Sequence, residues 1–350
     1  MDAVTGRCVV YRNHSVAVVV PAYNEAEHVG DVLATMPDFV DRVYAVDDAS
    51  TDDTWSVIRA HAARTATTAD VEPARNADAD AVADGGGLVV PIRQPENRGR
   101  GACVKLGYRR ALDEGYDVIA VMDGDGQMDP ALLDDILDPV VEGRADYAKG
   151  DRLRYPSTRR AMSGWRTFGN ALLTFLTKLS SGYWKTADSQ NGYTAVSRET
   201  LERVPFEELY DRYGFLNDVL TTLNVHGMRV TSVPHEAVYG TEDSGIRYRS
   251  FVPRLSALLA RNFVRRLVRR YLVLDFHPAA FCYLLGVVGL VVGLATAGLA
   301  TVALDRNALV GVLVSWVGVL LAAGLLVQAM VLDVRQSEEL ERVDPPAHTE

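Results

Sequence analysis

The stretch Val118-Ile-Ala-Val-Met-Asp-Gly-Asp-Gly-Gln127 joins an apolar run directly to an acidic, glycine-rich turn. A short apolar run that ends in a turn predicts a buried strand. Three earlier apolar runs are each followed by a polar, helix-forming segment, and they span 16–20, 42–46 and 88–92. Strands that alternate with helices predict an α/β fold with a parallel sheet covered on both faces. Because ligands bind at the carboxyl ends of strands in such sheets, we expect the acidic turn to lie in a binding site.

The pattern is less regular beyond Asp146, and one earlier segment does not fit it. Residues 65–87 consist mainly of Ala, Thr, Asp and Gly, and we interpret them as a solvated, flexible insertion. We place one α/β domain in residues 1–240. Its second half is predicted to contain helices at 163–179 and 216–224 and strands at 192–196 and 229–234.

The charge of the chain is unevenly distributed. The chain has 36 Lys and Arg against 46 Asp and Glu, which argues against a general nucleic-acid binder because such a protein needs a basic face. Residues 246–275 nevertheless hold eight arginines and one aspartate, so their net charge is +7 and that of the remainder is -17. Cys8, Cys103 and Cys282 are far apart in sequence, which excludes a disulfide scaffold and a thiolate zinc site.

Two uncharged stretches near the C-terminus, 279–303 and 308–332, are each 25 residues long. As helices they would span about 37 Å, enough to cross a hydrocarbon core of about 30 Å. A buried hairpin in a soluble domain is the alternative, but adjacent apolar stretches of this length are typical of membrane proteins. We predict a two-helix transmembrane hairpin at 279–332 in the cell membrane and a cytoplasmic tail at 333–350. The neighbouring arginines place the α/β domain and both termini on the cytoplasmic side.

The basic segment 246–275 lies between the α/β domain and the predicted hairpin. Its arginines alternate with apolar residues at spacings of three and four, a pattern typical of one or two amphipathic helices. We expect these juxtamembrane helices to lie on the cytoplasmic face and to contact anionic membrane lipids. A solvated helix packed on the α/β domain remains the alternative.

The acidic turn offers hard oxygen ligands from Asp123, Asp125 and Gln127. Such ligands suit Mg²⁺ or Mn²⁺, which is held by one or two carboxylates while phosphate oxygens complete the octahedron. A calcium loop would need Gly at its sixth position and Glu at its twelfth, where this chain has Met128 and Asp134. A plain acidic turn without a ligand is the alternative that remains.

Three further motifs accompany the earlier predicted strands. They are Pro21-Ala-Tyr-Asn-Glu25, Val46-Asp-Asp-Ala-Ser-Thr-Asp52 and Asn97-Arg-Gly-Arg-Gly101. Together with the turn at 123–127, they resemble in order and spacing the family 2 inverting glycosyltransferases of the dolichyl-phosphate mannose or glucose synthase type. The resemblance covers about residues 15–250. It implies a GT-A fold, which is a Rossmann-like, mostly parallel sheet with helices on both faces.

The resemblance also implies a nucleotide-diphosphate sugar as donor and a polyprenyl or dolichyl phosphate as acceptor. The product would be a lipid-phosphate-linked sugar used for protein glycosylation. Asp123, Asp125 and Gln127 would hold the metal against the diphosphate, and Asp125 would be catalytic. The residues carried over to nucleotide-sugar binding are Pro21, Tyr23, Glu25, Val46, Asp48, Asp123, Gly124 and Arg152.

Arginines are expected at the acceptor. By the same resemblance, the lipid phosphate would be bound by Arg152, Arg166 and Asn170, and Arg166 would also be catalytic. Arg159 is a further candidate because an anionic acceptor needs nearby cations. A phosphate monoester with a second pKa of about 6 is already anionic at neutral pH, so it needs cations to hold it rather than a strong base. Asp218 falls on the family's acidic helix near the sugar, where it would orient a hydroxyl or act as base. A solvated surface position is the alternative for Arg159.

One departure from the family concerns the donor. Ala237 and Gly245 stand where the mannose synthases carry an arginine and a lysine that clamp the diphosphate, so the sugar and the nucleobase stay open. Arg247 and Arg249 are close enough in sequence to substitute. Two other functions remain open, a glycosyltransferase of this fold with another lipid or glycan acceptor and an inactive, membrane-tethered nucleotide-sugar-binding module. The sequence does not indicate an oligomeric state.

Overall fold

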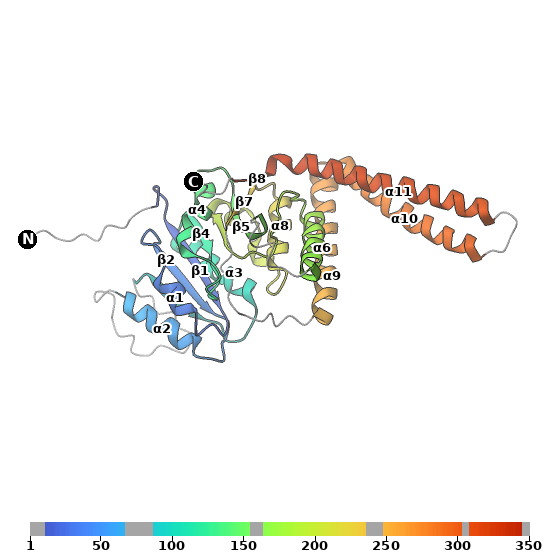
Figure 1. Cartoon of the computed structure of the whole chain (residues 1–350). Helices are drawn as coiled ribbons and strands as arrows, with labels where there is room; N and C mark the ends of the chain where they lie inside the picture. Colours follow the sequence, from blue (N-terminus) through green and yellow to red (C-terminus); the bar gives the residue numbers. More distant parts are fainter. Residues whose placement is uncertain (1–10, 67–86, 155–163, 236–247, 303–307, 345–350) are drawn as a thin grey trace, which may run out of the picture.

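The computed structural model describes residues 11–66, 87–154, 164–235, 248–302 and 308–344. Within these residues, eight strands form one sheet in the order β3-β2-β1-β4-β6-β5-β7-β8 (Figure 1). The strands are β1 (Val16–Ala22), β2 (Arg42–Asp47), β3 (Val89–Arg93), β4 (Val118–Val121), β5 (Tyr147–Asp151), β6 (Thr194–Ser197), β7 (Val230–Pro234) and β8 (Glu341–Val343).

The first four strands form a parallel half-sheet in which β1 lies between β2 and β4, and β3 pairs with β2. β1 and β4 consist mainly of Val, Ile and Ala and are buried along their whole length, as strands covered on both faces are. The connecting helices α1 (Val29–Ala34) and α2 (Thr54–Thr65) pack on one face, and α3 (Arg100–Glu114) packs on the other. The predicted α/β class is therefore confirmed.

The second half of the sheet changes direction. β6 runs antiparallel to both β4 and β5, whereas β5, β7 and β8 are parallel to one another. α4 (Leu133–Val141) packs on the face of α1 and α2, and α7 (Arg198–Arg203) and α8 (Phe215–Val225) pack on the face of α3. The sheet is thus mostly parallel, with one antiparallel strand in its middle.

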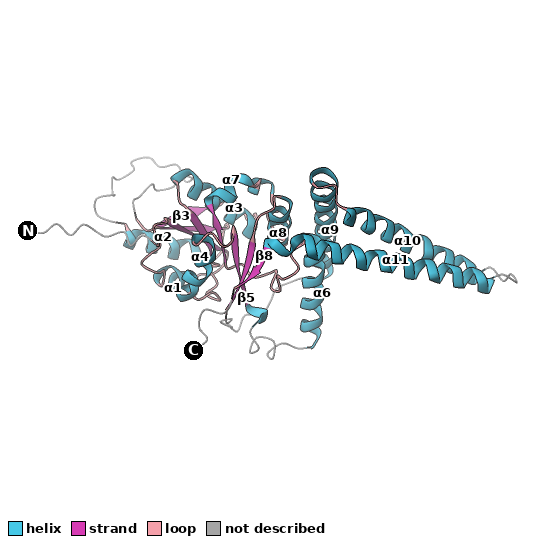
Figure 2. Cartoon of the chain, turned by 90° about the horizontal axis from the view of Figure 1, so that it is seen from above, coloured by secondary structure: helices cyan, strands magenta, loops and turns pink. Residues whose placement is uncertain are grey.

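Two long helices lie between the sheet domain and the C-terminal hairpin, and we call them the platform. They are α6 (Gly164–Ser181) and α9 (Tyr248–Arg266), which pack through Leu173 and Leu176 against Leu255, Leu258 and Leu259. A π-helical segment, η4 (Leu267–Leu274), connects α9 to the hairpin. Figures 1 and 2 show α10 (Pro278–Val302) and α11 (Ala308–Ser337) projecting from the platform away from the sheet.

The hairpin has the properties of a membrane-spanning pair. Among the described residues, Pro278–Val302 and Leu309–Leu340 form helices that are long and apolar enough to cross a membrane. Large apolar side chains cover their outer surface, as at Leu299 and Leu320, which are 71% and 69% exposed. Gly286 and Gly293 let the two helices approach closely, because a Cβ at either would lie within 2.8 Å of α11 side chains.

Two predictions about the C-terminal half differ from the structure. The arginines of 246–275 do not all face outward, since Arg266 and Arg270 are buried inside the protein. Residues 333–350 were expected to be a tail, but α11 continues to Ser337 and β8 then joins the sheet beside β7. Neither feature is visible in the periodicity of the sequence, because both depend on partners far away in the chain.

Candidate active site

The acidic turn leaves the carboxyl end of β4 beside that of β1. The backbone N–H of Gly124 donates to the carbonyl of Pro21 (3.0 Å), and the N–H of Gln127 donates to Oδ1 of Asp125 (3.0 Å). Gly126 adopts a φ of +72°, a left-handed conformation that glycine reaches without strain and that reverses the chain. The turn therefore holds two carboxylates at the edge of the sheet where ligands bind in α/β folds.

Asp123 in this turn is paired with Arg100, the first residue of α3. Nε of Arg100 lies 2.5 Å from Oδ1 of Asp123, and its Nη2 donates to the carbonyl of Gly192 (3.0 Å). Burial opposes the charge of Arg100, but Asp123 outweighs it and the pKa of the guanidinium is raised. Position 192 requires a glycine, because a Cβ there would lie 2.6 Å from Asp123 and 2.3 Å from Arg100.

The oxygen donors of the turn fit a divalent cation that shares its coordination with a ligand. Two carboxylates and one side-chain amide are donors that Mg²⁺ or Mn²⁺ takes. Among the described residues, no group of three His, Cys, Asp or Glu side chains could hold a metal ion without further ligands. A cation at Asp123 and Asp125 would thus complete its coordination with phosphate oxygens and water.

The loops after β1 and β2 interlock. The N–H of Asn24 donates to Oγ of Ser50 (2.9 Å), and the N–H of Glu25 donates to Oγ1 of Thr54 (2.8 Å). Tyr23 stands at their edge with 45% of its surface exposed. Side-chain to backbone bonds of this kind hold the loops in one shape before any ligand arrives.

Two of the residues expected to contact a nucleoside have structural partners. Val46 is fully buried in the core packed against α3. The carboxylate of Asp48 accepts hydrogen bonds from the backbone of Arg98 (2.9 Å) and Gly99 (2.8 Å) and from the side chain of Gln94 (3.0 Å). Asp48 therefore fixes the loop that leads into α3 and to Arg100.

A second cluster surrounds Arg152, just after β5. Nε of Arg152 lies 2.8 Å from Oδ2 of Asp188, whose carboxyl is almost fully buried. Burial opposes the charge of Asp188, but Arg152 lowers the pKa of this carboxyl below its usual value. Lys149 is also buried and donates to the backbone carbonyl of Asp188, and burial lowers the pKa of its ammonium. Arg152 is thus held by Asp188, which lies in the same short segment as Gly192, the partner of Arg100.

Asp218 lies in α8 and is 1% exposed. Its Oδ2 accepts from the N–H of Tyr210 (2.9 Å), and its Oδ1 accepts from Nη2 of Arg265 on α9 (2.7 Å). It lines a pocket of about 510 Å³ that also reaches Asn97 and Arg98 before α3. The structure therefore joins Asp218 to the platform through an ion pair with Arg265.

The candidate lipid-phosphate residues are only partly covered by the structure. Arg166 and Asn170 belong to α6, which places their backbones on the platform. Arg159 lies outside the described residues, as do Ala237, Gly245 and Arg247. The positions of these side chains stay predictions.

Sequence reasoning missed Arg100 and Arg265 as partners of Asp123 and Asp218. Arg100 stands inside the glycine-rich motif at 97–101, so a cation in that motif was a usable signal. Arg265 had no such signal, since eight arginines share its segment and its partner is 47 residues away.

Comparisons with known proteins identify the family to which this chain belongs. Residues 17–204, more than half of the chain, match Glycosyl transferase family 2. UDP-N-acetylglucosamine–dolichyl-phosphate N-acetylglucosaminyltransferase of Methanococcus voltae is 25% identical over 63% of this chain and 85% of its own. Undecaprenyl-phosphate mannosyltransferase of Micrococcus luteus is 28% identical over 63% of this chain and 82% of its own.

Among solved structures, glucosyl-3-phosphoglycerate synthase from Mycobacterium tuberculosis covers 72% of this chain and 80% of its own, with 18% identity and a TM-score of 0.49. The family match covers the strands β1 to β6 and the acidic turn after β4. It confirms the resemblance stated from the motifs. The chain belongs to glycosyl transferase family 2 and is a glycosyltransferase with the predicted GT-A fold.

Proposed function

We propose that this enzyme transfers a hexose from a nucleotide-diphosphate sugar to a polyprenyl or dolichyl phosphate at the cytoplasmic face of the membrane, in a metal-dependent and inverting reaction. The observation that carries the proposal is the platform, which puts α6 and α9 between the acidic turn and an apolar hairpin. The relatives from Methanococcus voltae and Micrococcus luteus support it, because their names specify dolichyl phosphate and undecaprenyl phosphate.

The donor would bind over the loops after β1, β2 and β4. Bound Mg²⁺ or Mn²⁺ supplies charge stabilisation to the leaving diphosphate. Asp123, Asp125 and Gln127 would hold the cation, and Asp123 would leave Arg100 to do so. Arg100 would then face the diphosphate, where a guanidinium holds phosphate oxygens by two parallel hydrogen bonds. The remaining donor contacts would come from Pro21, Tyr23, Glu25, Asp48, Gly124 and Arg152, whereas Val46 is fully buried and would only support the loop that follows β2.

The acceptor phosphate would be bound by Arg152 and by Arg159, Arg166 and Asn170. Its anionic oxygen attacks the anomeric carbon from the side opposite the leaving diphosphate, so the bond to the new oxygen forms as the old one breaks. Such an oxygen carries no proton that a base must remove. Asp218 is tied to Arg265, which suits a role in orienting a sugar hydroxyl better than a role as base.

The platform is also suited to lie on anionic lipids. Leu172 and Phe175 of α6, Val264 of α9 and Val268 of η4 are exposed apolar side chains. Arg261 and Arg265 of α9 and Arg269 of η4 line a pocket of about 130 Å³ against α8. Apolar contacts with the acyl chains and arginine contacts with headgroup phosphates would hold the platform at the membrane surface.

Transfer of a labelled sugar to polyprenyl phosphate tests the proposal. The full-length protein is assayed in vesicles with GDP-mannose, UDP-glucose or UDP-N-acetylglucosamine, each with Mg²⁺, with Mn²⁺ and with a chelator. We expect transfer from one of these donors and none in the chelator. Hydrolysis or binding of a donor without transfer to any lipid phosphate would contradict the acceptor class and favour an inactive binding module.

Two variants separate the donor and acceptor assignments. Asp125→Ala is expected to abolish metal-dependent transfer, and full activity in this variant would refute the metal site. Arg166→Ala is expected to raise the KM for the lipid phosphate more than the KM for the donor. No change in either the KM for lipid phosphate or kcat would refute Arg166 as an acceptor residue.

A further inference from the structure

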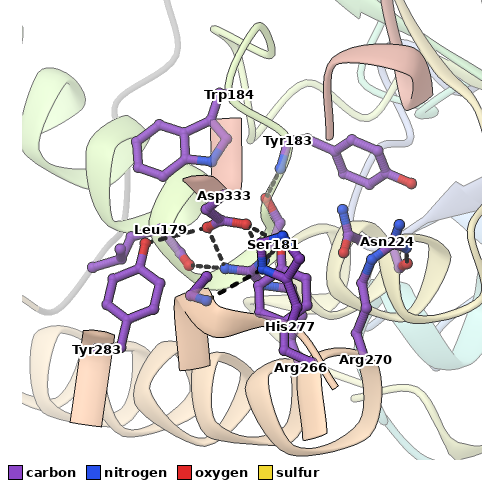
Figure 3. Close-up of polar contacts among 12 residues, drawn as sticks. Leu179, Ser181, Tyr183, Trp184, Asn224, Arg266, Arg270, His277, Tyr283 and Asp333 are labelled. Atoms are coloured by element: carbon purple, nitrogen blue, oxygen red, sulfur yellow. Dashed lines mark hydrogen bonds and ion pairs between the residues drawn. The ribbon is translucent and has the colours of Figure 1, made fainter. Parts of the chain in front are cut away.

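A buried ion pair links α9 to the second helix of the hairpin. Nη1 and Nη2 of Arg266 lie 2.7 and 2.8 Å from the two carboxylate oxygens of Asp333, and neither side chain has any exposed surface. The hydroxyl groups of Tyr271 and Tyr283 donate to the same carboxylate. Figure 3 shows Arg266 and Tyr283 converging on Asp333. We call these four residues, Arg266, Tyr271, Tyr283 and Asp333, the joint.

The joint also holds the end of α6. Nε of Arg266 donates to the carbonyl of Ser180 (3.1 Å), and Nη2 donates to the carbonyl of Leu179 (3.0 Å). These carbonyls lie in the last turn of α6, where backbone acceptors lack partners within the helix and a cation is favoured. Gly182 makes room for the guanidinium, because a Cβ there would lie 2.5 Å from Nη1 of Arg266. One side chain thus ties α6 to α11.

The joint lies at the platform end of the hairpin. Asp333 is 25 residues after the first residue of α11, or about 37 Å along the helix, beyond the roughly 30 Å of a hydrocarbon core. Tyr283 is near the start of α10. The apolar part of the hairpin determines how deeply the hairpin lies in a bilayer. Because the joint connects α11 to α6, it also determines the position of α6 relative to the bilayer.

A second contact reinforces this link beyond α11. The carboxylate of Glu341 in β8 accepts hydrogen bonds from the backbone N–H groups of Trp184 and Lys185, just after α6. The same stretch of chain continues to Asp188, which holds Arg152, and to Gly192, which contacts Arg100. The first part of the segment between α6 and β6 is therefore bound to β8, which follows the hairpin, and its last part contacts the candidate site.

We propose that Arg266 and Asp333 are positioning residues that set the height of α6 above the bilayer, so that an acceptor phosphate held in the membrane meets the site. The inference rests on the proposed function, since α6 carries Arg166 and Asn170. A pair of this kind cannot slide, because separating two fully buried charges leaves each of them without solvent. Neither residue touches the reacting atoms.

The test replaces the pair as a unit. Losing one partner leaves a buried charge and threatens folding, whereas a well-packed apolar pair of similar volume is often tolerated. The variant is therefore Arg266→Met/Asp333→Leu in the full chain. The matched control is Arg203→Met/Glu199→Leu, which removes an ion pair of the same charge on α7 whose side chains are 63% and 70% exposed.

Transfer is measured with two acceptors, a long-chain polyprenyl phosphate in vesicles and citronellyl phosphate in solution. Misplacement by about 1 Å costs on the order of 100-fold in rate, so we expect kcat/KM for the embedded acceptor to fall about 10- to 100-fold. With the soluble acceptor we expect no change, since it does not depend on the height of α6. Equal losses with both acceptors, or no loss with either, would overturn the proposal.

A measurement of depth does not depend on activity. A fluorescent label on Leu172→Cys of α6, in a chain without the three native cysteines, reports depth through quenching by brominated lipids. We expect the quenching profile to shift in the Arg266→Met/Asp333→Leu variant and not in the control, and identical profiles would overturn the proposal. If the unaltered enzyme transfers sugar to no lipid phosphate, the proposed function fails, while this measurement still tests the joint.

Discussion

The pairs Arg100–Asp123 and Arg266–Asp333 bring the same two kinds of side chain together in two regions of the molecule. Beside the acidic turn, the side chains of the first pair keep 28% and 22% of their surface exposed. In the joint, neither partner is exposed, and the carboxylate also accepts from Tyr271 and Tyr283. Water can solvate the first pair as it opens, whereas the second would leave buried charges without partners.

The same kind of ion pair is suited to two different purposes in this molecule. The pair at the turn suits a site where a carboxylate must exchange a guanidinium for another cation. The pair in the joint suits a place where two helices must keep one relative position. Burial, rather than the identity of the residues, separates the two roles.

The largest effect is expected from breaking the joint on one side. Asp333→Ala leaves Arg266 buried without its counter-charge and should lower the free energy of unfolding by about 3–5 kcal/mol. Arg266→Met/Asp333→Leu should recover part of this loss, because it removes the unpaired charge but leaves the hydroxyl groups of Tyr271 and Tyr283 without their acceptor. Denaturant unfolding in detergent measures both. A loss of similar size in the double variant would mean that the charges themselves hold the fold.

The pair at the turn should behave in the opposite way. Asp123→Asn is expected to lower kcat about 10²–10³-fold, the range seen when one electrostatic contact to the reacting groups is lost. Its unfolding curve should shift less than that of Asp333→Ala, because both partners are partly exposed. Activity at saturating Mn²⁺ and denaturant unfolding check the two halves. A large loss of stability would make this pair structural as well.

Glu341 makes the fastening of β8 dependent on pH. Burial raises the pKa of Glu341 to about 7, from 4.5 in an exposed glutamate. The folded state therefore binds this proton more tightly than the unfolded state does. Glu341 adds to the free energy of unfolding below pH 4.5, and this addition is lost as the pH rises to 7. The expected loss is on the order of 2–3 kcal/mol.

Unfolding curves at pH 5 and pH 7.5 test the sign. The unaltered protein should lose stability over this interval, and Glu341→Gln should lose less because its side chain does not ionise. Parallel pH profiles for the two proteins would show that Glu341 does not titrate in this range.

The smallest effect is expected at a glycine. Gly182 adopts a φ of +79°, and a Cβ there would meet Arg266. Gly227 adopts a φ of +70° with no described heavy atom within 4 Å of the position of a Cβ. Both alanine variants should therefore cost about 1–2 kcal/mol in backbone strain. Gly182→Ala should cost more in unfolding free energy, and equal losses would show that the guanidinium moves aside freely.

The sequence predicted the parallel half of the sheet well. β1, β2, β3 and β4 are apolar runs that end in polar turns, so local patterns identify both the strands and their carboxyl ends. The acidic turn after β4 was identified by the same reasoning. The strands and the turn depend on contacts between residues close together in sequence, so a local pattern is enough to predict them.

Other features depend on distant partners. Nothing near Arg266 distinguishes it from Arg265, yet one pairs with Asp333 and the other with Asp218. The antiparallel direction of β6 and the pairing of β8 with β7 are equally non-local. The three-residue strand β8 is too short for periodicity to reveal.

The sheet can be completed by β8 only after the rest of the sheet has been synthesised. The residues of β8 are translated after both apolar helices, yet they pair with β7 of a domain that left the ribosome much earlier. Until then the edge of β7 has open backbone hydrogen-bonding groups, which in general invite pairing with another chain. Completion of the sheet therefore marks a molecule whose hairpin has already been synthesised, and a chain truncated before residue 341 carries an uncovered edge.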